Sequence, residues 1–209
     1  MLIKKGAEAE LYRGRWMERE VIIKRRIAKP YRNPDLDRYI RTTRTSLEAK
    51  SLANARTLGV PTPIVYDVNL DEAEIIMSYI PGPPLKNVLP NLNDRKLKEL
   101  FIEVGRLVGI LHKGGIVHGD LTTSNMLLQD DRIFFIDFGL SEYTCDIEAR
   151  GVDIHLMRRA LESSHYLYSE LAYESFILGY KEIMKEEAID ILKRVEEIRK
   201  RGRYVGRHS

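Results

Sequence analysis

The sequence predicts an α+β fold with two lobes: a small N-terminal lobe built from an antiparallel sheet with one long helix, and a reduced, mostly helical C-terminal lobe. Short apolar runs occupy residues 20–24, 64–68 and 75–80, whereas helical spacing dominates residues 35–58 and most of the chain after residue 94. The strongest turn signal, Pro-Gly-Pro-Pro at residues 81–84, separates these regions. We therefore expect lobes at residues 1–80 and 81–209, the second with a basic tail at residues 199–209.

The N-terminal lobe is expected to begin as antiparallel sheet. Residues 11–12 and 20–24 predict two strands joined by a turn at residues 13–15, which include Gly14. Residues 35–58 predict a long helix that Gly59 and Pro61 end. Its apolar positions recur at near-helical spacing: Leu36, Ile40, Leu47, Leu52 and Ala55. Two more strands are expected at residues 64–68 and 75–80.

The C-terminal lobe is expected to be mostly helical. Asp94 can cap a helix that runs to residue 112. Residues 125–128 and 133–136 predict a short hairpin, and residues 153–163, 168–184 and 185–201 predict helices. Asp153 could either cap its helix or tie down the chain around residue 120, and the sequence favours neither.

Composition narrows the class of protein. The 209 residues contain a single cysteine, Cys145, and the chain starts without the charged, apolar and small-residue order of a signal peptide. No apolar run approaches the roughly 20 residues that a membrane helix needs. We expect a cytoplasmic protein with no membrane partner. The 34 basic and 31 acidic side chains leave a net charge of +3, too little to argue for nucleic acid from the whole molecule.

The most informative stretch is HGDLTTSN at residues 118–125, followed by Asp-Phe-Gly at residues 137–139. This pair of motifs resembles the catalytic loop and metal-binding turn of protein kinases. The resemblance implies that Asp120 orients or deprotonates an incoming hydroxyl, and that Asn125 and Asp137 hold Mg²⁺ ions that bridge the phosphates of ATP. The alternative is a hydrophilic turn beside a helix cap. We favour the catalytic interpretation because the two motifs occur in order around two short apolar strands.

Lys24 ends the apolar run Val-Ile-Ile-Lys, which matches the kinase strand whose lysine holds the α and β phosphates. A lysine in such a place needs an acidic partner, and Glu48 on the long helix is the first candidate. Glu10 is a rival candidate. On its own, Lys24 could equally end a strand in solvent.

Two further segments are expected to contact the nucleotide. Gly6, Ala7, Glu8 and Ala9 stand where kinases carry a glycine-rich loop, although a single glycine remains. The hinge between the lobes is expected just before the Pro-Gly cluster. Its main-chain groups would form hydrogen bonds with adenine, and a methionine would flank the base. The hinge residues are Met77, Ser78 and Ile80.

The sequence also departs from regulated protein kinases. Gly119 stands in place of the arginine that grips a phosphorylated loop, so switching by loop phosphorylation is not expected. Thr122 replaces a lysine two residues after the catalytic aspartate, which removes a positive charge from the transferring phosphate. The Ala-Pro-Glu sequence of the substrate-docking platform is missing. These departures favour slow chemistry or chemistry not directed at peptides.

Taken with GAEAEL, VIIKRR, LEAKSLANARTLGVPTP and IIMSYIPG, these motifs resemble one family, the small kinase subunit of the KEOPS complex, which is related to the eukaryotic PRPK kinase. The resemblance covers nearly the whole chain. It implies a bilobal protein-kinase-like fold and an atypical serine/threonine kinase that uses ATP and Mg²⁺, autophosphorylates and hydrolyses ATP. It also implies two partners: the subunit that transfers threonylcarbamoyl groups to tRNA, and a small regulatory KEOPS subunit.

Two basic clusters could contact tRNA, although a solvated helix face and terminus is the alternative. The tail cluster lacks acidic neighbours in its immediate sequence and consists of Arg199, Lys200, Arg201, Arg203 and Arg207. The second cluster starts the long helix and consists of Arg32, Arg38, Arg41 and Arg44.

Two competing functions stay open at this point. A RIO-type kinase or a small-molecule phosphotransferase would share the fold and tolerate the same departures. A catalytically silent scaffold that binds a partner or tRNA is the other. Intact Lys24, Asp120, Asn125 and Asp137 argue against the scaffold.

Overall fold

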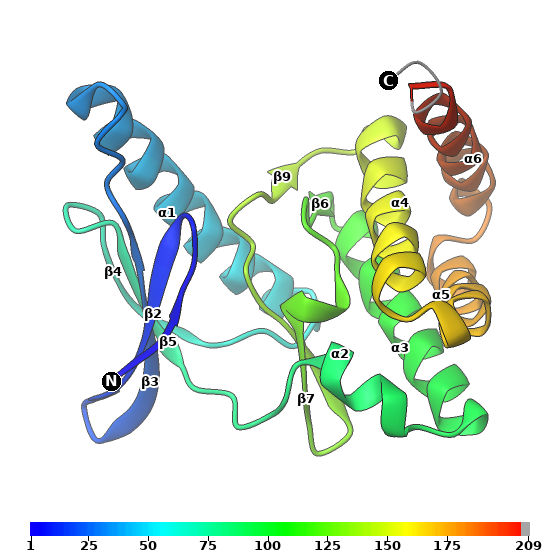
Figure 1. Ribbon diagram of the computed structural model, residues 1–209, viewed down its shortest axis with the longest axis horizontal. Helices are drawn as coiled ribbons and strands as arrows, with labels where there is room; N and C mark the ends of the chain where they lie inside the picture. Colours follow the sequence, from blue (N-terminus) through cyan, green and yellow to red (C-terminus); the bar gives the residue numbers. More distant parts are fainter. Residues whose placement is uncertain (206–209) are drawn as a thin grey trace.

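A computed structural model describes residues 1–205, with side chains as far as residue 201. The N-terminal part is a five-stranded antiparallel sheet in the order β1-β2-β3-β5-β4 (Figure 1). Its strands are β1 (Leu2–Lys5), β2 (Ala9–Trp16), β3 (Arg19–Arg26), β4 (Val65–Asn69) and β5 (Glu74–Ser78). One long helix, α1 (Pro34–Thr57), packs against β4 and β5.

The β2–β3 hairpin corrects one sequence prediction. Gly14 does not form the turn; it lies inside β2, opposite Val21 of β3. The turn is made by Met17 and Glu18, both of which have positive φ. Two consecutive left-handed residues match the right-handed twist of a tight hairpin, so the strands run on past Gly14 to residues 16 and 19. Apolar content therefore marked the strands but underestimated their length.

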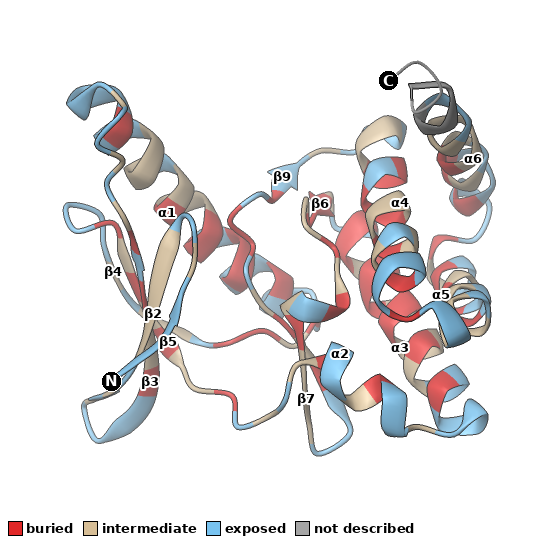
Figure 2. Ribbon diagram, viewed as in Figure 1, coloured by how far each residue is buried: buried red, intermediate tan, exposed pale blue. Residues whose placement is uncertain are grey.

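Helix α1 forms where its sequence predicts a helix, and local chemistry sets its start. The Asn33 side chain accepts hydrogen bonds from the main-chain N–H groups of Asp35 and Leu36, and Pro34 occupies the first helical position. The second half of the helix buries Ala49, Leu52 and Ala55. Figure 2 shows this buried stretch where α1 approaches the middle of the molecule. The helix thus presents one face from its C-terminal half to the core.

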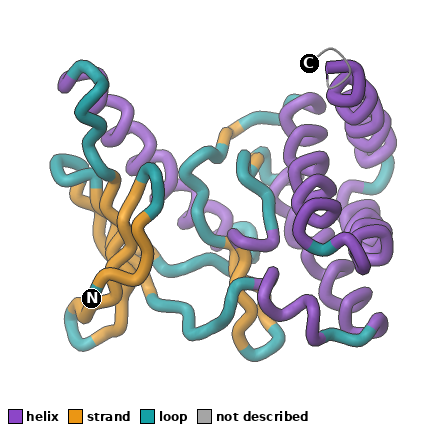
Figure 3. The backbone as a smooth tube through the Cα atoms, in the orientation of Figure 1, coloured by secondary structure: helices purple, strands orange, loops and turns teal. Residues whose placement is uncertain are grey.

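The C-terminal part is mostly helical, with short strands beside the sheet-bearing half (Figure 3). Its helices are α2 (Leu85–Val88), α3 (Asp94–Lys113), α4 (Ile147–Ser164), α5 (Ser169–Met184) and α6 (Glu187–Val205), with 3-10 turns at residues 89–91, 123–125 and 166–168. Its strands are β6 (Ile116–Val117), β7 (Met126–Gln129), β8 (Arg132–Phe135) and β9 (Glu142–Tyr143). The α+β class predicted from the sequence is confirmed.

Helix boundaries in this half differ from the prediction in three places. Asn93, not Asp94, caps α3, because its side chain accepts from the N–H of Lys96. Helix α4 begins at Ile147 with Asp146 as its cap, so Asp153 lies in mid-helix and caps nothing. Lys185 adopts a positive φ of 52° and ends α5 instead of starting the last helix.

Close packing of α3 on α5 builds the core of this half. A Cβ on Gly105 would lie 2.0 Å from the carbonyl oxygen of Phe176, and one on Gly179 would lie 1.9 Å from that of Ile102. Only glycine allows the two backbones to approach this closely. Phe101, Phe176 and Tyr180 are fully buried at this contact. The rigid helix pair supports the segments that carry the site.

The linker between the two halves is fixed to β7. The Leu128 N–H donates to the carbonyl of Pro83 at 3.0 Å, and Pro84 forms an isolated bridge with Leu127. A division into lobes between residues 80 and 81 stays a prediction. Among the described helices, none is both long and apolar enough to cross a membrane.

Candidate active site

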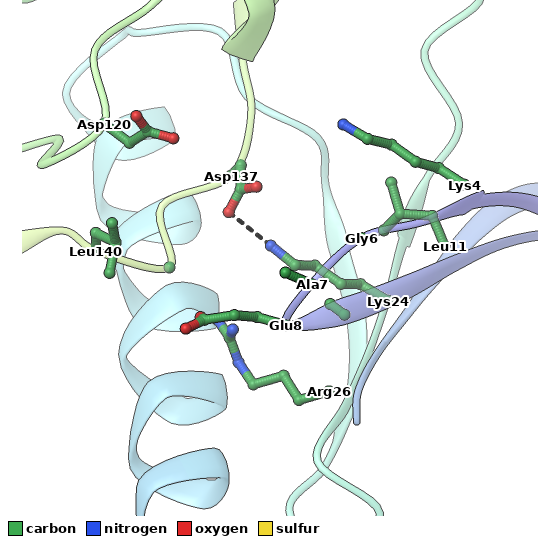
Figure 4. A pocket seen from close by; sticks show the side chains of 12 residues that line it. Lys4, Gly6, Ala7, Glu8, Leu11, Lys24, Arg26, Asp120, Asp137 and Leu140 are labelled. Atoms are coloured by element: carbon green, nitrogen blue, oxygen red, sulfur yellow. Dashed lines mark hydrogen bonds and ion pairs between the residues drawn. The ribbon is translucent and has the colours of Figure 1, made fainter. Parts of the chain in front are cut away.

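A cavity of about 250 Å³ lies between the sheet and the loops before and after β7–β8. Figure 4 shows its lining side chains, which come from β1, the loop after it, β2 and β3 on one side and from residues 120–140 on the other. The lining residues are Lys4, Gly6, Ala7, Glu8, Ala9, Leu11, Lys24, Arg26, Asp120, Asp137, Gly139 and Leu140. Motifs more than 90 residues apart in the sequence therefore face one space.

Lys24 joins the two sides of this cavity. Its Nζ donates to Oε1 of Glu48 at 2.6 Å and to Oδ1 of Asp137 at 2.7 Å. Burial alone would lower the pKa of the Lys24 ammonium, but the charges of Glu48 and Asp137 outweigh it and raise that pKa above its ordinary value. Lys24 is therefore charged at neutral pH and aimed from β3 toward Asp137 (Figure 4).

Glu48 is the buried centre of the ion pairs on α1. Its second oxygen, Oε2, accepts from Nη2 of Arg26 at 2.5 Å, so one carboxylate neutralises two buried cations. The rival partner, Glu10, pairs with Lys5 at 3.1 Å and accepts from the hydroxyl of Tyr12. The ion pair between Lys24 and Glu48 that the sequence predicts is present in the structure.

Asp120 and Asn125 are held in one fixed arrangement. The Asn125 Nδ2 donates to the main-chain carbonyl of Asp120 at 2.9 Å and to its Oδ2 at 2.8 Å. Both amide protons are thereby used, which leaves the Asn125 carbonyl oxygen as the free ligand atom of that side chain. The 3-10 turn at residues 123–125 places Asn125 directly before β7.

Asp137 adopts a left-handed conformation with φ 63°, and its side chain is half-exposed to the cavity. Burial would raise the pKa of the Asp137 carboxyl, but the charge of Lys24 outweighs it and lowers that pKa below the ordinary value. The next residue, Phe138, is fully buried, and the centroid of its ring lies 4.6 Å from that of the His118 ring. The strained backbone turns the Asp137 carboxylate toward the cavity while Phe138 anchors the turn.

The oxygen atoms near Asp137 fit a magnesium site that borrows ligands from a nucleotide. The free carbonyl of Asn125 and the second oxygen of Asp137 are hard donors of the kind Mg²⁺ prefers. Within the described residues, no group of three or more His, Cys, Asp or Glu side chains could hold a metal ion. Phosphate oxygens and water would have to supply the remaining ligands.

The backbone geometry explains why residue 119 is a glycine, which the motif alone did not. Its φ is 79°, and a Cβ at this position would lie 2.0 Å from the carbonyl oxygen of Leu140. No other residue fits without moving the chain after Asp137. The close approach brings the loop of Asp120 and the turn of Asp137 together.

Asp153 ties down the loop of Asp120 from below. Its Oδ2 accepts from the main-chain N–H of His118 at 2.7 Å and its Oδ1 from that of Gly119 at 2.9 Å. Burial alone would raise the pKa of this carboxyl, but hydrogen bonds from His112 and from the His118 main chain lower it below its ordinary value. Of the two roles that the sequence left open for Asp153, the structure shows the tie.

His118 is a structural residue of the same loop. Its Nδ1 accepts from the N–H of Asp120 at 3.3 Å, and its Nε2 lies 3.2 Å from the carbonyl of Ile136. With Nδ1 accepting, Nε2 is the ring nitrogen that donates to the Ile136 carbonyl. The ring therefore links the loops of Asp120 and Asp137.

The loop after β1 covers the cavity with its backbone. Gly6 N–H donates to the carbonyl of Ala9 at 2.9 Å, and the Lys29 ammonium donates to the carbonyl of Ala7. Glu8, which the sequence places near the phosphates, pairs with Arg44 of α1 at 2.6 Å. Its negative charge is thus partly neutralised, which removes one objection to a nucleotide at this place.

The expected hinge is only partly available. The Ser78 N–H donates to the carbonyl of Ile64 at 2.8 Å, and the Gly82 N–H donates to the carbonyl of Ile80 at 2.9 Å. The Ser78 N–H therefore already has a partner inside the protein, whereas the Ile80 carbonyl keeps a second lone pair. Met77 is buried, and none of the predicted hinge residues lines the described cavity. Adenine contacts by the rest of this segment stay a prediction.

The tail cluster has two acidic neighbours, Glu196 three residues before Arg199 and Glu148 on α4, so the expectation that it has none is wrong. Arg199 pairs with Glu196 at 3.1 Å, and Arg201 pairs across to Glu148 of α4 at 3.0 Å. Lys200 is exposed. The predictions on Arg203 and Arg207 lie outside the residues whose side chains are described. The Arg199 pair lies within α6, and the Arg201 pair links α6 to α4. Because both arginines already have acidic partners, the argument for direct RNA contact is weaker.

Sequence reasoning missed several cavity residues, among them Lys4, Arg26 and Leu140. Lys4 lies in a four-residue strand that is too short and polar to predict. The only signal for Arg26 was its place two residues after Lys24, which puts both side chains on one face of β3.

Comparison with known proteins places these features in context. A family model described as the RIO domain matches residues 14–150. The chain is 45% identical over 210 residues to the KEOPS complex subunit Bud32 of Pyrococcus abyssi, with 97% of this chain and 96% of that protein covered. It is 40% identical to a probable serine/threonine-protein kinase BUD32 homolog of Archaeoglobus fulgidus, with 100% of this chain and 99% of that protein covered.

Longer relatives contain the same unit. A probable bifunctional tRNA threonylcarbamoyladenosine biosynthesis protein of Methanosphaera stadtmanae is 40% identical over 97% of this chain, which spans 36% of that protein. The chain therefore corresponds to about a third of this relative.

Solved structures show the fold. The Rio2 kinase–ADP/Mg²⁺–phosphoaspartate complex of Chaetomium thermophilum is similar with a TM-score of 0.68 and 15% identity, covering 96% of this chain and 70% of that one. WaaP in complex with acyl carrier protein is similar with a TM-score of 0.63 and 17% identity, and the match covers 95% of this chain and 87% of that one. The kinase-like α+β fold predicted from the sequence is confirmed.

Proposed function

Because this chain belongs to the RIO-domain family and to the family of the KEOPS subunit Bud32, we propose that it is an atypical serine/threonine protein kinase and ATPase of a KEOPS complex. In this role it supports the threonylcarbamoyladenosine modification of tRNA. The observation that carries the proposal is the bridge from Glu48 through Lys24 to Asp137, in a cavity that Asp120 also lines.

The residues of the cavity fit phosphoryl transfer. Lys24 binds the α and β phosphates and is held in place by Glu48 of α1. Asp120 orients the acceptor hydroxyl. The acceptor oxygen bonds to the γ-phosphorus as the bond from that phosphorus to the β–γ bridging oxygen breaks. ADP then leaves with the electron pair, and Asp120 takes the hydroxyl proton. With water as acceptor, the products are ADP and inorganic phosphate.

The oxygens of Asn125 and Asp137 would hold Mg²⁺, which would neutralise the phosphate charge when bound. Asn125 has a second task, because its amide fixes the Asp120 carboxylate through the 2.8 Å contact. Lys24 contacts the same Asp137 carboxylate, so the cation that would bind phosphate oxygens stands directly beside these metal ligands.

The names of the relatives point to a KEOPS complex and to tRNA threonylcarbamoyladenosine biosynthesis, without naming partner subunits. We propose that the chain acts on or beside the KEOPS subunit that transfers threonylcarbamoyl groups, together with a small regulatory KEOPS subunit, in the cytoplasm. Contact with tRNA through Lys200 and the tail is a secondary proposal, because Arg199 and Arg201 already have acidic partners. The 8-residue path from Gly139 to Asp146 ahead of α4 offers little platform for peptide docking, which favours a dedicated protein partner over many peptide substrates.

The destination of the γ-phosphate distinguishes this function from its rivals. With γ-labelled ATP and Mg²⁺, we expect label on the chain itself and in inorganic phosphate, and faster phosphate release when the KEOPS transferase subunit is added. Separating protein-bound label from free phosphate measures both. Label transferred to sugar or aminoglycoside hydroxyls at comparable rates would instead indicate a small-molecule phosphotransferase. Nucleotide binding with no labelled product under any condition would indicate a scaffold.

A further inference from the structure

The sheet register places a second lysine on the same face as Lys24. Lys4 of β1 pairs with Leu11 of β2, and Leu11 pairs with Lys24 of β3. Residues directly opposite one another in a sheet share a face. All three line the cavity, and Lys4 and Lys24 stand two strand spacings apart, about 10 Å. Figure 4 shows the Lys4 side chain extending from β1 toward the side of the cavity that carries Asp120 and Asp137.

The neighbouring lysine has a different environment. Lys5 pairs in register with Glu10, which pairs with Arg25 on the opposite face of the sheet. Its Nζ forms an ion pair with Glu10 at 3.1 Å. Alternation along the strand thus separates two adjacent lysines: one faces the cavity and one belongs to a surface ion pair.

Lys4 is the cavity-lining cation without a carboxylate partner in the described part of the chain. Lys24 contacts Glu48 and Asp137, and Arg26 contacts Glu48. No ion pair or hydrogen bond of the Lys4 ammonium occurs among the described residues, and the side chain is exposed to the cavity opening. An unpaired ammonium beside a space that faces Asp120 and Asp137 is available to an anionic ligand.

The loop of Asp120 increases the need for such a cation. Residues 118–125 contain no lysine or arginine, because Thr122 stands where a lysine would be expected, so the loop brings no positive charge to a phosphate. On the opposite side of the cavity, the glycine loop contributes one carboxylate, Glu8, and backbone amides. The remaining source of positive charge near the phosphates is the sheet face that carries Lys4.

We infer that Lys4 is a phosphate-binding residue of the nucleotide site, donating a charge-assisted hydrogen bond to a non-bridging oxygen of the polyphosphate chain. The inference rests on the proposed function, since it requires ATP in this cavity. Lys24 and Lys4 then contact the polyphosphate from two points on one sheet face, and Lys4 supplies the charge that the loop of Asp120 lacks. No proton is transferred in this contact; the ammonium stabilises negative charge in the bound nucleotide.

Binding measurements with adenosine, ADP and ATP test this role. Lys4→Met should weaken the binding of ADP and ATP by about 10- to 100-fold, the size of one lost hydrogen bond to a charged group. Adenosine, which has no phosphate, should bind Lys4→Met as it binds the wild type. Lys5→Met is the matched control, because it removes an adjacent lysine of β1 from the other face, and its affinities for all three ligands should be unchanged. Lys4→Arg should restore most of the affinity for ADP and ATP.

The outcomes separate the inference from the proposed function. If wild-type protein binds ATP and Lys4→Met binds it equally well, the inference is wrong while the proposed function stands. An equal loss for adenosine and ATP would also overturn it, since Lys4 would then support the fold of β1 or the base. If the wild type binds no nucleotide at all, the proposed function itself fails.

Discussion

Asp120→Asn is expected to reduce the rate of γ-phosphate transfer by about 10²- to 10⁴-fold, the range typical of a lost general base. ATP affinity should change little, because Lys24, Glu48 and Asp137 are untouched. Asparagine has nearly the shape of aspartate and can still accept the hydrogen bond from Asn125 through its carbonyl oxygen. It cannot accept a proton at neutral pH. Single-turnover measurements with labelled ATP, beside a direct binding titration, separate the two effects.

Asp131→Asn provides the control for this substitution. Asp131 lies in the β7–β8 turn with φ 60°, where asparagine is well tolerated, and it does not line the cavity. We expect wild-type rates from this variant. A transfer rate for Asp120→Asn close to that of Asp131→Asn would remove Asp120 from the mechanism.

Glu48→Gln is expected to cost about 3–5 kcal/mol of the free energy of unfolding, the range for a buried ion pair that loses one partner. The Glu48 carboxylate is fully buried and neutralises Lys24 and Arg26 together. A neutral amide leaves the Arg26 guanidinium, which is itself buried, without an anionic partner. The loss should also loosen α1 from β3, so ATP turnover should fall with stability. Denaturant unfolding gives the free energy, and ATP consumption gives the second readout.

Glu20→Gln is the matched control for stability. Glu20 forms a surface pair with Arg13, and both side chains are substantially exposed, so solvent screens the interaction. Only a small change in the unfolding midpoint is expected. Equal midpoints for Glu48→Gln and Glu20→Gln would mean that the buried ion pairs contribute little to this fold.

The parts of the site that could be predicted from the sequence are residues that lie in short motifs and whose chemical roles require those residue types. Asp120, Asn125 and Asp137 occur in an order that fits phosphoryl transfer, and the resemblance of Lys24 to the kinase lysine made Glu48, on the predicted helix, its first candidate partner ahead of Glu10. Fold class followed from apolar spacing in the same way. These features depend on local sequence, so one chain was enough to find them.

The parts that could not be predicted depend on pairing between distant segments. The facing of Lys4 and Lys24 follows from the β1–β2–β3 register, and β1 has too few apolar residues to be recognised as a strand. The first turns of α4 were not predicted because its apolar pattern is interrupted by two polar residues, Arg150 and Asp153, that are nevertheless buried. The partner of the Ser78 N–H, the carbonyl of Ile64, likewise follows from contact between separate segments and not from local sequence.

Magnesium-dependent ATP consumption by the wild type and by Asp137→Ala tests the central claim most directly. Alanine removes the carboxylate that contacts Lys24 and faces the phosphates, and it leaves the buried core, including Phe138, unchanged. We expect the wild type to consume ATP only with Mg²⁺, and Asp137→Ala to show no consumption above background while it unfolds cooperatively. If both proteins consume ATP at the same rate, or if neither does with the KEOPS transferase subunit and tRNA added, the assignment of this cavity as an active site is contradicted.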